Sequence, residues 1–380
     1  MISRVRIGDL GEVITGNTPP RNKPEYYGSH TPFIKATDID ESSKYTYSPE
    51  ESYSEAGYRK YRKSLIPKGS TCVVTIGSIG KKMTMAHCDC FINQAMNAII
   101  PSADYDPEYV YYVVKNNVHR LKSLDSGTAS GRENVSKFAF SNLEIDVIDD
   151  IGTQKRIGSL LSNYDYLIEN NQKQIKLLEE AAQRLYKEWF IDLRFPGHET
   201  TPIVDGVPEG WKQLALEQIT PILTGKKDAN FSTEDGRYPF FTCAQAPLRA
   251  PSYSFDCNAV ILAGNGDFNV KLYRGKFEAY QRTYVLSPEC TEYLYLLYHA
   301  VNNSMVKLSQ AASGSTIKFL TKGMIASIPV YTPEVKNLEK FNTLSEAIQK
   351  QIEVLKKSIA NATEARDRLL PKLMSGEIEV

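Results

Sequence analysis

Residues 180–190 read EAAQRLYKEWF, and residues 364–374 repeat the pattern without a gap as EARDRLLPKLM. The glutamate, the first alanine, the arginine and the leucine coincide at an offset of 184 residues. Further matches pair 129–131 with 312–314, 73–77 with 260–264, and 94–101 with 281–288. A repeat of this length exceeds the roughly 20 to 50 residues of solenoid units. The chain therefore contains a duplicated domain, which predicts a pseudo-twofold molecule that engages two similar targets.

Each copy predicts a β-rich domain followed by one long helix, which is an α+β fold. The runs TCVVTIGSIGK (71–81) and FINQAMNAIIP (91–101) lie between Gly, Pro and Asn residues, as strands and turns do. Short helices are expected near 107–124 and 291–308. The predicted parts are a first domain at 1–150, a long helix at 151–192, a linker at 193–210, a second domain at 211–332 and a second long helix at 333–376.

The long helices are predicted from apolar residues that recur every seven positions. The first series contains Ile157, Tyr164, Asn171, Leu178 and Leu185, with Leu161, Ile168, Ile175, Ala182 and Trp189 as its companion row. The second contains Phe341, Ile348, Leu355, Ala362 and Leu369, with Ile352, Ile359 and Leu373. Five heptads predict helices of about 55–60 Å at 1.5 Å per residue. Because each stripe alone would be an exposed apolar seam, we expect the two helices to pack together, antiparallel.

Residues typical of helix ends flank both heptad series. Asp149 or Asp150 can cap the first helix, and Thr332, followed by Pro and Glu, can cap the second. Gly197 and Gly376 follow the predicted C-terminal ends. Asn171 lies within the seam and could fix its register, but it aligns with Leu355, so a solvent-facing position is an equal alternative.

The composition is that of a globular protein with room for two or three domains. The chain has 380 residues, of which 42% are hydrophobic and 24% charged. No run approaches the roughly 18 apolar residues of a membrane span, and MISRVRIGDL lacks the core of a signal peptide. We therefore expect a cytoplasmic protein with reduced thiols. His87, Cys88 and Cys90 cluster in the first copy without a counterpart in the second, so no metal site is expected.

No catalytic constellation is present in the sequence. NTPP (17–20) departs from the NPP[YF] motif of amino-methyltransferases, and AGNGDF (263–268) lacks the second glycine pair and the lysine of nucleotide-binding loops. We therefore expect no catalytic residues and no cofactor in this chain. The net charge of zero also weighs against a generic polyanion binder, so DNA binding would need local charge or a partner that supplies it.

The strongest binding signal is a segment that mixes aromatic and basic residues. It consists of Tyr58, Arg59, Lys60, Tyr61, Arg62 and Lys63. That mixture suits phosphate contact with stacking on sugar or base, although a solvated face is an equal alternative. The segment falls in a stretch where the first copy carries about 20 extra residues, because the offset between the copies drops from 207 to 187.

Two matched turns between strand and loop supply the remaining candidate DNA contacts, since loops on a rigid sheet often carry recognition. The first-copy candidates are Ser78, Lys81 and Lys82. The second-copy candidates are Lys226, Lys227, Asn265, Lys271, Arg274 and Arg282. A purely structural turn is the alternative for the glycines of these loops, and ordinary surface charge is the alternative for each single cation.

Several stretches of the sequence resemble one known protein family, the DNA-specificity subunits of type I restriction–modification enzymes. EAAQRLYKEWFIDLRFPG (180–197) with VPEGWKQLALEQI (207–219) is similar to the middle of these subunits, and LLPKLMSGEI (369–378) to their C-terminus. GSTIKFLTKGMIASIPV (314–330) resembles the segment that leads into the helix. TQKRI (153–157) resembles the start of the helix, but Thr153 replaces the usual glutamate, and 335–337 departs further.

The resemblance implies two target-recognition domains, each reading one half of a split double-stranded DNA sequence. It also implies that two long helices act as spacer and as docking surface for two methyltransferase subunits, which motor-nuclease subunits can join. S-adenosylmethionine, Mg²⁺ and ATP would then belong to the partner subunits, and this chain would be non-catalytic. A DNA-independent scaffold and a stand-alone enzyme are the alternatives from other classes.

The same resemblance makes the helix seam a candidate docking surface. Its residues are Ile157, Leu161, Tyr164, Ile168, Ile175, Leu178, Leu185, Trp189, Phe190, Ile348, Ile352, Leu355, Ile359, Leu369 and Leu373. Trp189 and Phe190, at the end of the first helix, could form an apolar docking face. Ordinary packing into the adjacent domain is the alternative, and it is at least as well supported.

Overall fold

The duplication is visible strand by strand in the computed structural model, which describes residues 1–127, 131, 133–312 and 318–380. Most of the matched Ala-Ser-Gly runs at 129–131 and 312–314 lies outside these residues. In each copy four antiparallel strands follow the same spatial order. The first sheet consists of β2 (Gly11–Thr15), β9 (Met96–Pro101), β6 (Thr71–Val74) and β7 (Met83–Met85). Its counterpart consists of β14 (Ile222–Thr224), β19 (Thr283–Leu286), β17 (Phe255–Ala263) and β18 (Val270–Ala279).

Smaller ladders also recur in both copies. In the first copy β4 (Thr31–Ile34) pairs in parallel with β8 (Phe91–Ile92) and antiparallel with β5 (Glu51–Tyr53), which also pairs with β3 (Tyr27–Gly28). In the second, β15 (Tyr238–Phe241) pairs in parallel with β18 and antiparallel with β16 (Leu248–Ala250). β1 (Ile2–Arg6) with β10 (Glu144–Ile148) corresponds to β13 (Lys212–Ala215) with β20 (Pro329–Thr332). β11 (Ile203–Val204) and β12 (Val207–Pro208) form a hairpin in the connector.

A glycine follows the first strand of each sheet because any side chain at that position would clash with a neighbouring backbone. A Cβ at Gly16 would lie 2.1 Å from the carbonyl oxygen of Asn93, and one at Gly225 would lie 2.0 Å from that of Ala279. Only a residue without a side chain allows the backbones to approach this closely. The similar sequences ITG (14–16) and LTG (223–225) therefore place a glycine at the same close backbone contact in both copies.

The helices also follow the duplicated order. α2 (Pro107–Asn117) with a 3-10 continuation to Leu124 corresponds to the 3-10 turn Thr291–Tyr293 with α5 (Leu294–Ala311), and α3 (Lys137–Ser141) corresponds to α6 (Lys322–Ala326). The long helices are α4 (Ile151–Tyr186), which continues as a π-helical turn at Lys187–Ile191, and α7 (Val335–Met374). They contain 36 and 40 residues, which gives lengths of about 54 and 60 Å. α1 (Glu55–Tyr61) has no helical counterpart between β16 and β17.

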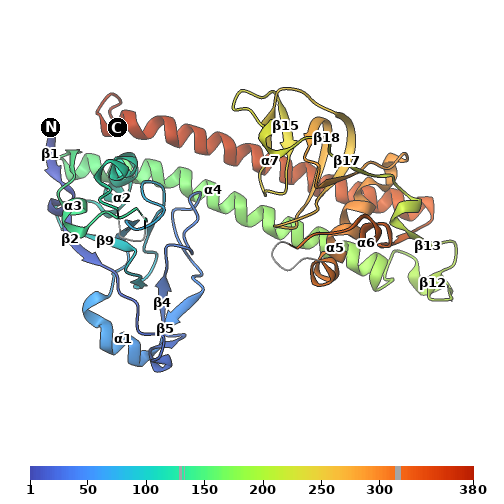
Figure 1. Ribbon diagram of the computed structural model, residues 1–380, viewed down its shortest axis with the longest axis horizontal. Coiled ribbons are helices and arrows are strands. Elements are labelled where there is room, and N and C mark those ends of the chain that lie inside the picture. The colour runs from blue at the N-terminus through green and yellow to red at the C-terminus, as the bar shows by residue number, and fades with distance from the viewer. Residues whose placement is uncertain (128–130, 132, 313–317) are drawn as a thin grey trace. The chain divides into compact units, whose positions relative to one another are not determined.

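The chain forms two compact units, and each long helix contributes to both (Figure 1). Unit 1 contains residues 1–173 and 356–380, and unit 2 contains residues 174–355. The core of unit 1 combines α2 with residues of both long helices, including Ile157, Leu161 and Leu373. The core of unit 2 includes Trp189 and Phe341. Each unit therefore consists of one β-rich domain and a segment of both long helices.

The predicted cap of the first helix is confirmed, whereas that of the second is wrong. The carboxylate of Asp150 accepts a hydrogen bond of 2.7 Å from the backbone N–H of Thr153. Thr332 instead ends strand β20, and its hydroxyl donates to the carbonyl oxygen of Lys212 at 3.1 Å. The strand pairing with β13 extends through Thr332, so α7 begins at Val335, two residues later than this cap would require.

Within unit 1 the two helix segments pack antiparallel, as predicted. The amide of Asn171 donates to the hydroxyl of Ser358 at 3.0 Å, and the guanidinium of Arg366 pairs with Asp165. Asn171 is only 4% exposed, so it lies in the seam and the solvent-facing alternative is wrong. The other predicted seam residues on both helices are buried or half-buried.

Trp189 and Phe190 are packed within unit 2 and do not form an exposed docking face. The ring of Trp189 lies 5.9 Å from that of Phe341, and the ring of Phe190 lies 5.5 Å from that of Trp211. Both side chains are buried. The packing alternative for these two residues is therefore the one that the structure adopts.

Candidate nucleic-acid interface

The two predicted recognition loops occupy matching places, each at the end of a central strand. In unit 1 the residue before the loop, Ile76, forms a β-bridge with Asn134. In unit 2 the loop residue Asn265 forms a β-bridge with Phe319. Each loop is thus held against the segment that precedes α3 or α6. This matched support gives the two domains the same framework with different side chains on it.

The unit 1 loop borders a cavity of about 450 Å³. The candidates Ser78 and Lys82 line it together with Thr37 and Glu133. The ammonium group of Lys82 donates to the carbonyl oxygen of Ala36 at 3.4 Å, whereas Lys81 is exposed outside the cavity. This site therefore offers a hydroxyl, an ammonium group and a carboxylate, the kinds of group that read the edges of bases.

The unit 2 loop borders a smaller cavity of about 270 Å³. Arg282 lines it with Gln281 and Phe319, and all three side chains are exposed. Asn265 lies beside this cavity, but its amide oxygen accepts a hydrogen bond of 2.7 Å from the thiol of Cys243. Arg282, which lies between β18 and β19, is therefore the best-placed charged candidate at this cavity.

The aromatic–basic segment separates into two faces. Tyr58 and Tyr61 pack inward against the buried cluster that contains Tyr53 and Phe91, with the Tyr53 and Tyr61 rings 5.8 Å apart. The basic residues Arg59, Lys60, Arg62 and Lys63 are exposed, and Arg59 pairs with Glu55. The two tyrosines are thus used for packing, so stacking on bases is not supported, while phosphate contact by the four cations stays a prediction.

Three of the cations predicted in unit 2 already have partners within the chain. The ammonium group of Lys271 donates to the carbonyl oxygen of Ala244 at 2.9 Å, and burial lowers its pKa. The guanidinium of Arg274 donates to the hydroxyl of Tyr295 at 2.6 Å. The ammonium group of Lys227 lies 4.4 Å from the centre of the Phe231 ring. Lys226 is exposed and, with Arg282, is the more accessible candidate.

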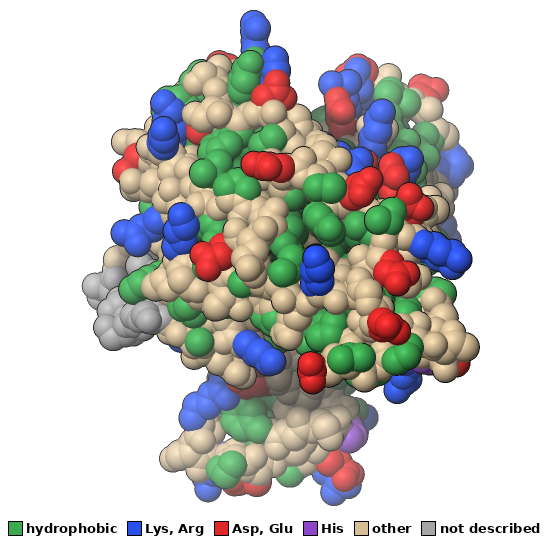
Figure 2. All heavy atoms as spheres, turned by 90° about the vertical axis from the view of Figure 1, so that its right-hand side faces the viewer, with side chains coloured by type: hydrophobic (Ala, Val, Ile, Leu, Met, Phe, Trp, Pro, Cys, Tyr) green, Lys and Arg blue, Asp and Glu red, His purple; other side chains and the backbone are tan. Residues whose placement is uncertain are grey.

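The structure also brings forward residues that the sequence did not single out. Thr37, Glu133, Gln281 and Phe319 line the two loop cavities. Gln281 is the first residue of the matched block 281–288, so the sequence offered a signal for it. Thr37, in contrast, lies in a segment that has no match in the other copy. Figure 2 shows basic and acidic side chains interspersed on the face that it draws. This mixture agrees with the net charge of zero and with recognition that depends on local charge.

The part of the chain that the structure describes holds no group of three or more His, Cys, Asp or Glu side chains arranged to bind a metal ion. Among the described helices, none combines the length and the hydrophobicity of a bilayer-spanning segment.

Comparison with known proteins gives the family. The model of the type I restriction modification DNA specificity domain matches residues 3–180 and 208–364. The EcoDI specificity subunit of Escherichia coli is 39% identical over 178 residues, which span 45% of this chain and 39% of that subunit. The MjaIX specificity subunit of Methanocaldococcus jannaschii is 27% identical over 99% of this chain and 93% of its own length.

A solved structure supports the same fold. The S subunit of a type I restriction–modification system from M. genitalium has a TM-score of 0.62 and 16% identity, and the match covers 98% of this chain and 96% of that one. The family model matches each copy of the duplicated domain separately and covers most of the chain. This chain belongs to the family of type I restriction–modification DNA specificity proteins.

Proposed function

We propose that this chain reads a bipartite DNA sequence for a type I restriction–modification complex, with one half-site for each β-rich domain. The observation that carries the proposal is the double match to the specificity domain, which coincides with two copies of one fold. Because the loops of the two copies carry different side chains, the half-sites should differ in sequence. A target of this kind is split and non-palindromic.

The proposed partners are double-stranded DNA, two methyltransferase subunits and, in the complete enzyme, motor-nuclease subunits. The methyltransferases would supply S-adenosylmethionine and transfer its methyl group to adenine, and Mg²⁺ and ATP would serve the motor-nuclease. This chain would contribute recognition and docking and no reacting group. Partners that enclose the DNA would also supply the phosphate attraction that a chain of net charge zero lacks.

The recognition mechanism follows from the framework of the domains. Exposed cations such as Lys60 and Arg62 would contact phosphates and fix the position of each domain on the duplex. The loops at residues 77–82 and 264–269 would present side chains to base edges in the major groove. Sites on one face of the duplex recur every 34–36 Å or so, so we expect half-site centres about one helical turn apart.

A methylation map tests the proposal directly. The chain is co-expressed with its neighbouring methyltransferase gene in a methylation-free host, and N6-methyladenine is read across the genome by single-molecule sequencing. The expected result is a split motif with a fixed gap that is lost when this chain is omitted. A stable complex without new methylation would contradict the sequence-reading role and leave a scaffold.

A further inference from the structure

One turn has the same backbone in both units but carries a different side chain at a single position. In unit 1 this turn lies between β8 and β9 and contains Gln94 and Ala95. In unit 2 it lies between β18 and β19 and contains Gln281 and Arg282. At the offset of 187 residues the two glutamines coincide, whereas the alanine of unit 1 corresponds to the arginine of unit 2.

The backbone hydrogen bonds show that Ala95 and Arg282 occupy equivalent places. In each unit the N–H of the next residue closes the turn by donating to the carbonyl oxygen two residues before this position, at 3.1 Å in unit 1 and 2.8 Å in unit 2. The carbonyl oxygen at the position itself accepts a hydrogen bond of 2.8 Å from the residue that follows the central strand. The donor is Thr75 in unit 1 and Gly264 in unit 2. The two side chains therefore start from the same point of the framework.

Each of these two residues lines the loop cavity of its own unit. In unit 2, Arg282 brings a guanidinium group to the cavity of about 270 Å³. In unit 1, Ala95 brings only a methyl group to the cavity of about 450 Å³, and Ala36 and Ile76 also line that cavity. The copies thus differ most sharply at a position that the fold presents in the same way.

The guanidinium group of Arg282 is available to an incoming molecule. The side chain is exposed, and among the described residues its guanidinium has no hydrogen-bond or ion-pair partner. No carboxylate from the described part of the chain lines its cavity. Gln281 is more engaged, because its amide donates to Asp228 at 3.4 Å. Arg274 of the same unit is also engaged, since it donates to Tyr295.

The backbone that carries Arg282 is held by contacts outside the turn. The N–H of Gln281 donates to the carbonyl oxygen of Lys227 at 2.9 Å. The thiol of Cys243 donates to the carbonyl oxygen of Arg282 at 3.7 Å, in addition to the bond from the central strand. A side chain that reads a base by hydrogen bonds needs a rigid support of this kind.

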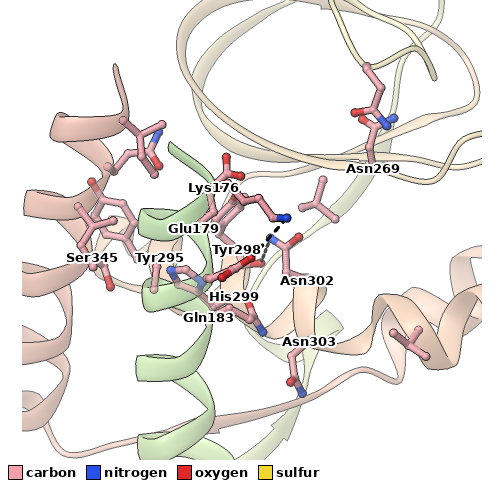
Figure 3. Close-up of a pocket in the computed structure, with 18 residues that line it drawn as sticks. Lys176, Glu179, Gln183, Asn269, Tyr295, Tyr298, His299, Asn302, Asn303 and Ser345 are labelled. Carbon is pink, nitrogen blue, oxygen red and sulfur yellow. Dashed lines mark hydrogen bonds and ion pairs between the residues drawn. The ribbon is translucent and has the colours of Figure 1, made fainter. Parts of the chain in front are cut away.

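The loop 264–269, which borders the same cavity, is also fixed within the chain. The amide of Asn269 donates to the carbonyl oxygens of Cys243 at 3.0 Å and Asp267 at 2.7 Å. Figure 3 shows this side chain apart from His299 of α5, at a second cavity of about 650 Å³ that both residues line. Both the turn and the loop are therefore in place before any ligand binds.

The wall of the Arg282 cavity favours a planar, electron-rich ligand. Phe319 lines the cavity and is 39% exposed, so it offers an aromatic face. The exposed Lys318 and Lys322 flank the lining stretch 319–321 in the sequence. Lysines at the rim suit phosphates, because phosphate contacts position a protein on DNA. The arginine at the cavity remains for the edge of a base.

The donors of a guanidinium group match one base in particular. In the major groove guanine presents two acceptors side by side, O6 and N7, and arginine donates to both at once. Adenine and cytosine present an amino donor, which would face the donors of the arginine, and thymine presents a single acceptor beside a methyl group. An arginine held at this position therefore selects guanine.

We propose that Arg282 is a specificity-determining residue that reads a guanine in the half-site of unit 2, by donating hydrogen bonds to O6 and N7. This inference rests on the proposed function, because it requires that the loop cavities face the major groove. Ala95 has no donor in its side chain, so unit 1 does not select guanine through the equivalent position. The same turn thus gives the two half-sites different sequences.

The first test removes the guanidinium group. Arg282→Ala is co-expressed with the methyltransferase, and its methylation map is compared with that of the wild type. We expect one guanine of one half-site to become variable, while the other half-site and the gap stay the same. On duplexes that differ only at this base pair, the preference of the complex for guanine should fall at least about fivefold. Arg237→Ala, at an exposed arginine outside the cavity, is the matched control and should leave the motif unchanged.

The second test transfers the arginine to unit 1. Ala95→Arg should create a preference for guanine at one position of the other half-site, again by at least about fivefold. Ala95 is half-buried, so the melting temperature of this variant is measured first. If it does not fold, Arg282→Ala alone decides, because Arg282 is exposed and its removal leaves the core intact.

Three results would overturn the proposal. The first is an Arg282→Ala complex that methylates all sequences more slowly without a change of motif, which would make Arg282 a phosphate contact. The second is an unchanged motif at an unchanged rate. The third is a pair of folded variants whose changes fall in the same half-site. If the wild-type chain directs no methylation at all, the proposed function fails instead, so the two failures are distinguishable.

Discussion

The buried pair of Asp165 and Arg366 is the residue-scale feature on which unit 1 most depends. Both side chains are less than a tenth exposed, and the hydroxyl of Tyr112 donates to the same carboxylate. Removing one partner of a buried pair leaves an uncompensated charge, which costs about 3–5 kcal/mol. We predict that Arg366→Met lowers the free energy of unfolding by this amount, measured by urea denaturation.

Replacing the whole polar group provides the control for that prediction. The triple variant Arg366→Met, Asp165→Leu and Tyr112→Phe removes both buried charges and the hydroxyl together. Asp367, which also pairs with Arg366, is exposed and stays solvated. We expect it to recover most of the lost stability, because packed apolar groups of similar volume often replace buried ion pairs without net cost. A triple variant as unstable as the single one would contradict the electrostatic explanation.

The buried His299 makes the free energy of unfolding of unit 2 depend on pH. Burial lowers the pKa of His299 from 6.5 to about 4. Between these values the unfolded chain binds a proton that the folded chain does not, so stability is lost as the pH falls from 6.5 towards 4. The contribution amounts to roughly 3 kcal/mol. We predict that His299→Gln reduces this acid loss in pH-dependent melting, whereas His119→Gln, at an exposed position, leaves it unchanged.

At the scale of the element, the segment formed by α1 and the 3-10 turn that follows it (Arg62–Ser64) separates packed tyrosines from exposed cations. Its tyrosines lie three residues apart and pack on one face, while its cations lie on the other. We predict that Lys60→Ala with Arg62→Ala leaves the fold intact and weakens binding to all DNA sequences similarly. The logarithm of the DNA-binding constant decreases linearly with the logarithm of the salt concentration. The steepness of this decrease should fall by about 0.9 for each phosphate that the variant no longer neutralises.

Tyr61→Ala is the informative comparison for the α1 variants. Its ring packs on Tyr53, so we expect a lower melting temperature with an unchanged salt dependence of DNA binding. A salt slope that is unaffected by the loss of Lys60 and Arg62 would show that α1 does not contact phosphate. These measurements use the assembled complex, in which the proposed function places the DNA.

The elements were largely predictable from the sequence, because their causes are local. Heptad spacing predicted α4 and α7, and the period of α1 was available in the spacing of Tyr58 and Tyr61. The cap at Thr332 was wrong because a strand pairing with a segment more than 100 residues away overrides the local signal. The pair of Asp165 with Arg366 was not predictable either, since each residue alone is typical of a solvated helix face.

The positions of the two candidate loops were predicted from the sequence, whereas the contacts of their candidate side chains were not. The matched glycines and strand ends located both loops correctly. Lys271 and Arg274, in contrast, are held by groups of other elements, which no local pattern reveals. Thr37 and Glu133 reach the first loop cavity only through the tertiary fold. A single sequence therefore locates these candidate loops better than it identifies the side chains that surround them.

For the whole molecule, the proposed function makes the paired helices the ruler of the DNA target. Deleting residues 170–176 of α4 together with residues 353–359 of α7 removes one heptad from each helix and about 10 Å of length. We predict that the gap in the methylation motif shortens by about three base pairs, at 3.4 Å each, or that modification is lost. The methylation map of the wild type is the reference.

Inserting one heptad at the same two positions is the matched control, and it should lengthen the gap or abolish modification. A deletion variant that still modifies the wild-type motif would contradict the ruler. Loss of modification with a lost melting transition would instead report unfolding, so the circular dichroism of each variant is recorded alongside its methylation map.

The discontinuity of unit 1 has a consequence for how the protein is made. Domains generally fold as they leave the ribosome, the N-terminal one first, at about 5–20 residues per second. Unit 1, however, needs Arg366, Leu370 and Leu373 from the last stretch of the chain. Its first 173 residues must therefore wait roughly 10–35 s while unit 2 is synthesised, at that rate. The domain that is translated first is completed last, so only a full-length polypeptide yields a finished unit 1.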